Sequence, residues 1–476
     1  MSDHSHGGNK YIHLLQEFSI PLLAGVVAAL AVANIDFETY DRLVHGTWSY
    51  VTGEEYHGHG HGGGHDAGHD GDDHAHADDH DHHDDHAHDN DAGHADDHDH
   101  GGDEHAIESH GGDHNEPWWH HYATLHFIIN DLFMVVFFGV AAKEITEACL
   151  PGGALNPPSK AVNPLLGTIG GVLGPVGFYF LFNVMMGQEA WSNGWGIPTA
   201  TDIALAWLVA RMVFGNGHPA IAFLLLLAVA DDGIGLMIIA IFYPDPLHPT
   251  EWLNALWILP GMAVAYMFRR MDVKAWVPYV LIGGGLSWWG FYSAHLHPAL
   301  ALVPIVPLLP GPARDEGLFR DDVTTTETDT LNNFEHAVKT FVDFGLFFFA
   351  FANAGVPFSN LNNLTWIVLL SLLVGKTVGI FFFSYVGKLI GFPLPKGMNE
   401  KHLLVAGVVA GLGLTVALFV AGQAFKIDIP SQGAAKMGAL FSGGIALVAI
   451  VLGAILRVKD GAGQEDNDAA QQGAEH

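Results

Sequence analysis

An apolar stretch interrupted by two adjacent carboxylates decides the fold of this chain: residues 220–242 have the sequence AIAFLLLLAVADDGIGLMIIAIF. About 20 apolar residues are enough for a helix to cross the hydrocarbon core of a membrane. The middle of this stretch nevertheless carries Asp231 and Asp232. A charge at that depth costs about 2.5–3.5 kcal/mol on insertion scales, so it indicates a functional site. The stretch therefore predicts a membrane-spanning helix that brings charge to the middle of the bilayer.

Eleven further stretches are long and apolar enough, or nearly so, to cross a membrane. The twelve predicted spans are residues 18–35, 123–142, 163–186, 197–214, 219–242, 252–268, 275–293, 296–310, 338–355, 364–386, 403–425 and 435–457. The fourth and eighth spans are short, and Pro and Gly interrupt them. We therefore predict an all-α integral membrane protein with about twelve transmembrane helices.

A polar insertion hides this membrane character in the overall composition. The chain has 476 residues and a net charge of −32. Residues 53–116 hold 18 of its 32 His, 21 of its 51 acidic residues and no Lys or Arg, which leaves 30 acidic against 19 basic residues elsewhere. Such a composition cannot support a core, so we expect a disordered insertion. The lack of a basic patch excludes nucleic-acid binding, and the single cysteine, Cys149, excludes an internal disulfide framework.

The basic residues set the predicted orientation, because Lys and Arg accumulate on the cytoplasmic side of membrane proteins. With the N-terminus in the cytoplasm, fifteen of them face the cytoplasm and only Arg42, Lys426 and Lys436 face the other side. We therefore expect a multi-pass protein of the cell inner (plasma) membrane, with both termini cytoplasmic and the His-rich insertion periplasmic. The first span ends in Ala31-Val32-Ala33, which resembles a signal-peptide cleavage site, but its length favours a retained helix.

This orientation divides the chain into five segments. They are a cytoplasmic tail at 1–17, a first transmembrane helix at 18–35, an extracytoplasmic loop at 36–122 that contains the insertion 53–116, a core of eleven helices at 123–458 and a cytoplasmic tail at 459–476.

Three more charged side chains stand out within predicted spans, namely Asp131, Asp202 and Lys376. Residues adjacent in a helix point about 100° apart. One member of the Asp231-Asp232 pair can therefore meet a partner on another helix while its neighbour faces a cavity. Lys376 is the only buried cation that the spans offer as that partner. For Asp131, near the outer end of its helix, a structural role is as good an interpretation as a functional one.

Two spans carry signs of a broken helix. The fourth contains Ile197-Pro198-Thr199-Ala200-Thr201-Asp202, in which proline removes a backbone donor. The eleventh contains four glycines between 407 and 422, of which Gly407 and Gly411 alone would favour close helix packing. Together the two spans favour interrupted helices, which occur at membrane depth where they line a cavity and present helix ends to ions.

Five motifs resemble those of the NhaA-type sodium/proton antiporters, in the family's order and at about its spacing. They are Ile197-Pro198-Thr199-Ala200-Thr201-Asp202-Ile203-Ala204, Ala230-Asp231-Asp232-Gly233, Phe349-Ala350-Phe351-Ala352-Asn353-Ala354-Gly355, Gly375-Lys376 and Gly411-Leu412-Gly413-Leu414-Thr415. The resemblance covers nearly all of residues 10–460 apart from the insertion. It implies twelve helices with inverted repeats (helices three to five and ten to twelve) and two broken, crossing helices, four and eleven.

The resemblance also implies roles for individual residues. Asp232 would be the ion ligand, Asp231 the partner of Lys376, and Thr201 a neighbouring ligand. Asp202 would neutralise the positive helix ends that meet at the crossing, and Lys376 the negative ones. The implied activity is exchange of sodium or lithium for protons, with more than one proton per sodium, serving pH and sodium homeostasis. It involves no catalytic residue and no cofactor.

A response to pH is implied for Glu144, Glu335 and His336, and here the chain departs from the family. Glu144 is followed by Ile145-Thr146-Glu147-Ala148 instead of a basic and an acidic residue, and a second family histidine near His336 is absent. The family's homodimer contact uses a hairpin after the first helix. The His-rich insertion takes that place, so this sequence does not predict the dimer contact.

Two other classes of protein fit part of the sequence. The insertion suggests a divalent-metal/proton exchanger or a metal-sensing transporter, because neutral imidazoles suit Zn, Ni and Cu. Loose metal binding is expected at closely spaced His residues, namely His57, His59, His61, His80, His82 and His83. No His or Cys, however, lies beside the buried aspartates in the sequence. An intramembrane aspartyl protease would need Tyr-Asp and Gly-x-Gly-Asp motifs, which are absent at Asp202 and Asp231.

Overall fold

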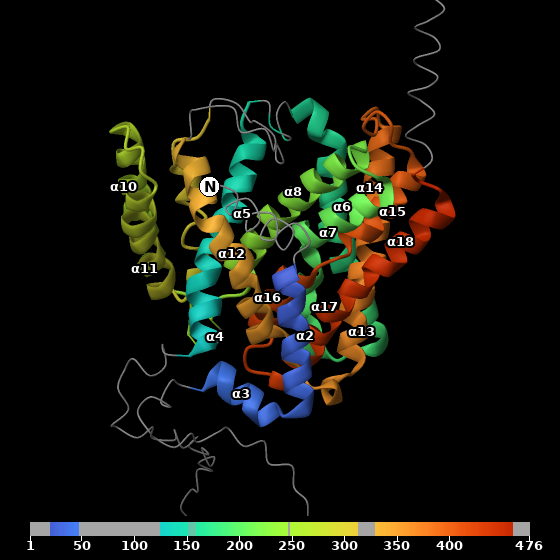
Figure 1. Ribbon diagram of the computed structural model, residues 1–476, viewed down its shortest axis with the longest axis horizontal. Helices are drawn as coiled ribbons and strands as arrows, with labels where there is room; N and C mark the ends of the chain where they lie inside the picture. Colours follow the sequence, from blue (N-terminus) through green and yellow to red (C-terminus); the bar gives the residue numbers. More distant parts are fainter. Residues whose placement is uncertain are drawn as a thin grey trace, which may run out of the picture.

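The computed structural model describes residues 20–46, 124–151, 153, 155, 158–245, 248–312 and 329–459. All regular secondary structure in these ranges is helical, and the helices form one bundle (Figure 1). This confirms the predicted all-α fold class.

The elements fall into α-helices, short 3-10 helices and π-helical turns. In chain order they are α2 (Ile20–Ile35), α3 (Phe37–His45), α4 (Leu125–Phe127), the π-helix η3 (Ile128–Phe133), α5 (Met134–Cys149), α6 (Pro158–Met186), the 3-10 helix η4 (Glu189–Thr199), α7 (Ile203–Phe214), α8 (Pro219–Phe242), α9 (Trp252–Ala255), α10 (Ile258–Arg270), the π-helix η5 (Tyr279–Gly284), α11 (Gly285–Ser293), the 3-10 helices η6 (Pro298–Leu300) and η7 (Val306–Leu308), α12 (Thr330–Ala354), the 3-10 helix η8 (Phe358–Asn360), α13 (Asn363–Leu370), the π-helix η9 (Ser371–Gly375), α14 (Lys376–Leu389), α15 (Glu400–Ala410), α16 (Leu414–Ala424), α17 (Ile429–Phe441), the 3-10 helix η10 (Ser442–Gly444) and α18 (Ile445–Leu456).

Six helices of the described part are long and apolar enough to cross a membrane, and two bent pairs raise the number to eight. The bent pairs are the predicted broken spans: η4 meets α7 at 60°, and α15 meets α16 at 47°. Each bent pair lies in the chain between long helices, α6 and α8 for the first, α14 and α17–α18 for the second. This is the arrangement that the predicted inverted repeats require. The first, sixth and seventh predicted spans are shorter helices, found in α2, α10 and η5–α11.

The eighth predicted span is not a regular α-helix. Residues 296–310 form no continuous α-helix but two 3-10 turns, η6 and η7. Pro298, Pro304, Pro307 and Pro310 recur through this stretch, and each lacks the N–H that an α-helix needs. The stretch is apolar because it lies in the protein core, where Leu300, Leu302, Ile305 and Val306 are buried.

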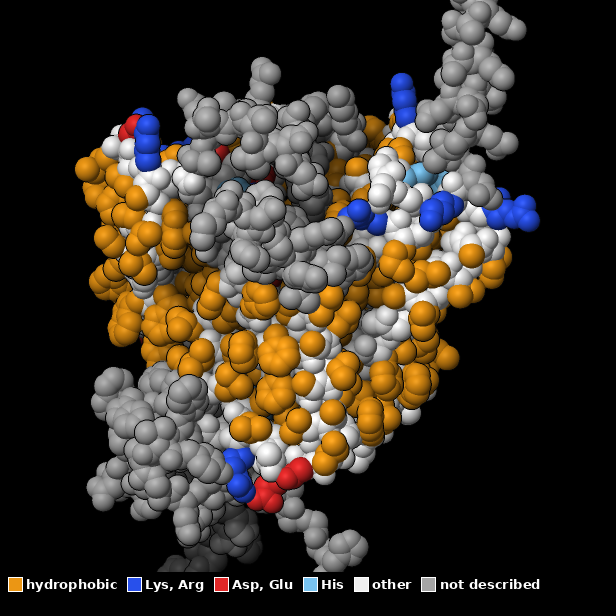
Figure 2. Space-filling view, viewed as in Figure 1, with side chains coloured by type: hydrophobic (Ala, Val, Ile, Leu, Met, Phe, Trp, Pro, Cys, Tyr) orange, Lys and Arg blue, Asp and Glu red, His pale blue; other side chains and the backbone are white. Residues whose placement is uncertain are grey.

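A short amphipathic helix, α3, closes one end of the bundle. Its Tyr40 is buried, donates a hydrogen bond to the Phe351 carbonyl at 2.7 Å and accepts one from Gly355 N at 3.1 Å. Burial raises the pKa of the Tyr40 phenol above its ordinary value, so the hydroxyl stays protonated and keeps both bonds. Figure 2 shows a broad belt of hydrophobic side chains, with most of the visible Lys and Arg at the end opposite α3.

Glycines let α6 and α14 approach closely. Gly170 and Gly174 on α6 face Gly375 and Gly379, which belong to η9 and α14. A Cβ atom added at Gly379 would lie 2.9 Å from the Gly174 Cα and closer still to the Gly170 carbonyl oxygen. This four-residue spacing of small residues is typical of membrane helix contacts. The contact positions Lys376, which lies between the two glycines of its segment.

We expect Gly379→Ala to lower the melting temperature of the purified protein in detergent, since backbone atoms must move apart, at a cost of about 1–3 kcal/mol. Gly177→Ala on α6 is the matched control, because a Cβ there meets nothing within 4 Å. Alanine otherwise favours a helix over glycine by up to about 1 kcal/mol, so the control should not be destabilised. Equal melting temperatures for both variants would contradict this packing.

Candidate functional site

The breaks of the two bent helices lie against each other in the core. Between η4 and α7, the Asp202 N–H donates to the Leu412 carbonyl at 2.6 Å, within the break between α15 and α16. Irregular backbone is tolerated at membrane depth only where protein or a cavity satisfies it. The two interrupted helices satisfy each other here, and both breaks are buried.

Asp202 lies at two positive helix ends. Its Oδ1 accepts from Leu205 N at 3.1 Å and so caps α7, while its Oδ2 accepts from Thr415 N at 3.3 Å in the first turn of α16. Helix N-termini carry unsatisfied N–H groups and a partial positive charge, so a carboxylate stabilises both ends. The role that the family resemblance implies for Asp202 stays a prediction.

Lys376 lies at the negative side of the same crossing. Its Nζ donates to the Thr201 hydroxyl at 2.5 Å and to Asp231 Oδ2 at 2.9 Å, and neither charged side chain is exposed. The Thr201 Oγ1 also lies 3.0 Å from the carbonyl of Ala410, the last residue of α15. A cation therefore stands close to the C-terminal end of a broken helix, where a positive charge is favoured.

The π-helix η9 directly precedes Lys376: it ends at Gly375, and α14 begins at Lys376. π-helical turns hold an extra residue and are frequent at functional sites.

Asp232 lies outside this ion pair. It borders a small cavity of about 10 Å³, enough for one water-sized sphere. Its lining residues are Phe137, Phe138, Ala141, Asp232, Leu236 and Val416. The buried Asp232 Oδ1 makes no hydrogen bond within the described part of the chain. Among the residues that line the cavity, Asp232 is the only charged one, so it has a carboxylate oxygen available for a cation or a proton.

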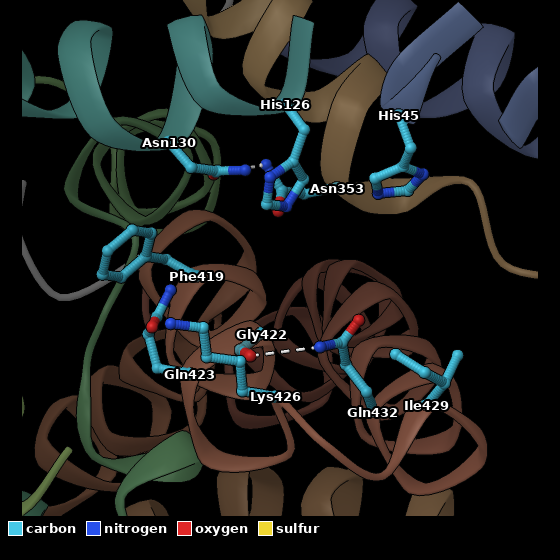
Figure 3. Close-up of a pocket in the computed structure, with 10 residues that line it drawn as sticks. All are labelled: His45, His126, Asn130, Asn353, Phe419, Gly422, Gln423, Lys426, Ile429 and Gln432. Atoms are coloured by element: carbon cyan, nitrogen blue, oxygen red, sulfur yellow. Dashed lines mark hydrogen bonds between the residues drawn. The ribbon is translucent and has the colours of Figure 1, made fainter. Parts of the chain in front are cut away.

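A second, larger pocket of about 180 Å³ lies at the end of the bundle where α3 is found (Figure 3). His45, His126 and Lys426 line it together with polar residues. One of these, Asn353, donates to Asn130 Oδ1 at 2.9 Å. Asn353 belongs to one of the motifs that carried the family resemblance. The pocket gives the described part of the bundle a polar recess on the α3 side.

The residues predicted to respond to pH are brought together only in part. Lys143 pairs with Glu147 at 2.6 Å on its own helix and with Glu335 on α12. Glu144 follows Lys143 on α5, while His336 is exposed. Lys143 was not among the residues predicted to act here. The signal was available, because Lys143 and Glu147 have the four-residue spacing at which helical side chains meet.

The predicted metal ligands of the insertion, from His57 to His83, lie outside the described residues, so their roles stay predictions. The functional roles of Asp202, Asp231, Asp232, Thr201 and Lys376 also stay predictions, although the structure places these side chains around one crossing.

Two broken helices that cross at membrane depth, with charged side chains at the crossing, define a class of protein: a secondary transporter of ions. The chain belongs to the Na+/H+ antiporter family, because the family model described as Na+/H+ antiporter 1 matches residues 106–456. It is therefore a transporter and not an enzyme, and the resemblance seen in its sequence is confirmed.

Curated relatives support the same membership over most of the chain. The Na(+)/H(+) antiporter NhaA of Geobacter metallireducens is 50% identical over 451 residues, which cover 94% of this chain and 99% of the relative. The Na(+)/H(+) antiporter NhaA of Desulfitobacterium hafniense is 49% identical over 451 residues, with 94% and 97% covered. That of a Jannaschia species is 46% identical over 358 residues, with 71% and 84% covered.

We expect Lys376→Ala to destabilise the protein by about 3–5 kcal/mol, because it leaves Asp231 buried without its counter-charge. In the double variant with Asp231→Asn, much of this loss should be recovered, giving a coupling energy of about 1–3 kcal/mol. Melting in detergent of the two single variants and the double variant measures the coupling. Strictly additive losses would show that the pair is not stabilising in the way its geometry indicates.

Proposed function

We propose that the chain exchanges Na+ for H+ across the membrane through competition of the two ions for Asp232. The observation that carries this is the difference in surroundings between the adjacent carboxylates Asp231 and Asp232. Lys376 and Thr201 hold Asp231 through its Oδ2, whereas Asp232 lies outside this ion pair and borders a cavity. In the described chain the Oδ1 atoms of both carboxylates are without a hydrogen bond. A carboxylate in such a place holds a hard cation or a proton, but not both.

Exchange follows if the site opens to either side only when it is occupied. A proton must then leave Asp232 before Na+ binds, and Na+ must leave before the carboxylate is protonated again. The two breaks are the natural place for this movement, since short segments with helix ends at the ion site move more readily than unbroken helices. No covalent step is needed.

The ion pair supports a second proton in the cycle. If Asp231 becomes a Na+ ligand, its bond to Lys376 is weakened, and the lysine then loses a proton. Release of two protons per Na+ moves net charge, so the membrane potential drives the cycle at about 2.3 kcal/mol per charge per 100 mV. Lithium, a smaller hard cation, is expected to replace sodium.

The cation preference follows from the ligand types at the site. Among the residues that line the Asp232 cavity there is no His or Cys, the ligands that select Zn or Cu. Carboxylate, hydroxyl and carbonyl oxygens suit hard cations. This favours Na+ over the divalent-metal exchange that the insertion suggested.

We further propose that the α3 end of the bundle faces the periplasm and the basic end the cytoplasm of an inner membrane. Arg269, Arg270 and Lys388 lie in the last turns of α10 and α14, at the basic end. This distribution agrees with the positive-inside rule. In that orientation the 180 Å³ pocket is the periplasmic approach to the site, and the Lys143–Glu335 pair joins α5 to α12 on the cytoplasmic side, where the family's pH response is expected.

Asp232→Asn should reduce Na+-driven proton movement in proteoliposomes to the level of protein-free vesicles, because an amide does not take up a proton and binds Na+ weakly. Asp272→Asn is the matched control. This exposed aspartate has a φ of 55°, a conformation that asparagine also adopts, so wild-type flux is expected. A dye that reports vesicle pH gives the flux, with Na+, Li+ and Zn2+ added in turn. Wild-type flux in the Asp232 variant would overturn the assignment, and flux driven by Zn2+ alone would favour the metal exchanger.

A further inference from the structure

We propose that Asp245, His248 and His295 form a binding site for a zinc-type divalent metal ion, separate from the transport site. The three residues come from the segments that follow α8 and α11. Each offers one ligand atom, and these atoms all lie within 4.8 Å of one another. The site takes no part in the proposed exchange at Asp232, so it goes beyond that function.

The side chains already face one another. Asp245 Oδ2 lies 3.2 Å from His248 Nδ1. The rings of His248 and His295 stack with centroids 4.8 Å apart and planes inclined by 13°. Ligand atoms around a tetrahedral zinc, each at about 2.0–2.2 Å from the ion, are roughly 3.3 Å apart. The stacked rings have nearly parallel planes, so metal binding requires a rotation of the exposed His248 side chain that makes its nitrogen lone pair converge with that of His295.

The backbone holds two of the ligands in place. Asp245 N donates to the His295 carbonyl at 3.0 Å, which joins the two segments directly. Glu251 N donates to the Ala294 carbonyl at 3.2 Å beside it. His295 has a φ of 58°, a conformation that costs energy for most residues other than glycine. The fixed backbone thus sets the separation of the carboxylate and the second imidazole before any ion binds.

The ligand types select the ion. Two neutral imidazoles and one carboxylate form a set that zinc accepts as three protein ligands, with water in a fourth position. Imidazole also suits Cu and Ni, whereas Na+ and Ca2+ prefer oxygen alone. Ions have access, because the side chains of His248 and Asp245 are 57% and 25% exposed.

Lys426 competes with the metal ion for Asp245. Its Nζ lies 3.4 Å from Asp245 Oδ1, and the same lysine lines the 180 Å³ pocket. A divalent ion bound to Asp245 repels the Lys426 ammonium group and replaces it as the partner of the carboxylate. Occupation of the metal site therefore changes the charge at the mouth of the pocket.

The test is zinc protection of individual histidines in the full-length protein in detergent. Diethyl pyrocarbonate modifies accessible imidazoles, and mass spectrometry of peptides assigns each modification. His248 and His295 are thereby scored apart from the 18 histidines of residues 53–116. We expect zinc to protect both residues from modification, with the same zinc concentration giving half protection of each. The exposed His336 is the internal control and should stay reactive.

Variants separate this site from zinc held by the insertion alone. Asp245→Asn should raise the zinc concentration needed for half protection of His248 (the zinc midpoint) at least tenfold, and His295→Gln should do the same. Lys426→Gln should lower it several-fold by removing the competing cation. Melting in zinc-free buffer checks that each variant is folded. The proposal is overturned if His248 stays reactive at zinc concentrations that protect the insertion, or if its protection is unchanged in folded Asp245→Asn. An unchanged midpoint in Lys426→Gln would contradict the competition.

Discussion

The ion pair between Lys376 and Asp231 is the interaction on which the rest of the structure depends. Neither side chain is exposed, so each charge would be strongly unfavourable without the other. The pair fixes α14 against α8 and, through Thr201, against the break of the first bent helix. The contact lies where the broken helices meet. Asp202 accepts hydrogen bonds at the N-terminal ends of α7 and α16, and Lys376 bonds Thr201 beside the C-terminal end of α15.

Close packing makes that electrostatic arrangement possible. Glycines on α6 and around η9 bring two backbones into contact beside Lys376, which bonds Thr201 and Asp231. The same approach buries Asp231, since a Cβ added at Gly171 would lie 3.3 Å from both of its carboxylate oxygens. Shape and charge at the crossing are therefore coupled. A larger side chain at Gly375 or Gly379 would move the backbone that carries Lys376 and so disturb the ion pair.

The sequence predicts much of this fold because the membrane restricts it strongly. Apolar stretches indicated the spans, and a pair of aspartates within one of them indicated the site. In the stretch 296–310, hydropathy did not predict that the regular α-helix would be replaced by 3-10 turns, because hydropathy takes no account of the repeated prolines. The Lys143–Glu335 pair and the Asp245, His248 and His295 cluster were not predicted, because each joins residues far apart in the chain. Only the packing of helices and loops determines such distances. The individual roles came from family resemblance, not from spacing.

The π-helical turn before Lys376 also affects how the gene can vary. Residues 371–375 hold one residue more than an α-helical path of the same length would. Removal of a single codon there would return the segment to a regular α-helix with its two flanks close to their present orientation, since the turn already absorbs the extra residue. Lys376 would keep its place at the start of α14, while the side chains of residues 371–375 would be redistributed around the helix. A change of length by one residue therefore costs the bundle less in this segment than in an unbroken helix such as α8, where the same deletion would turn one flank by about 100° relative to the other.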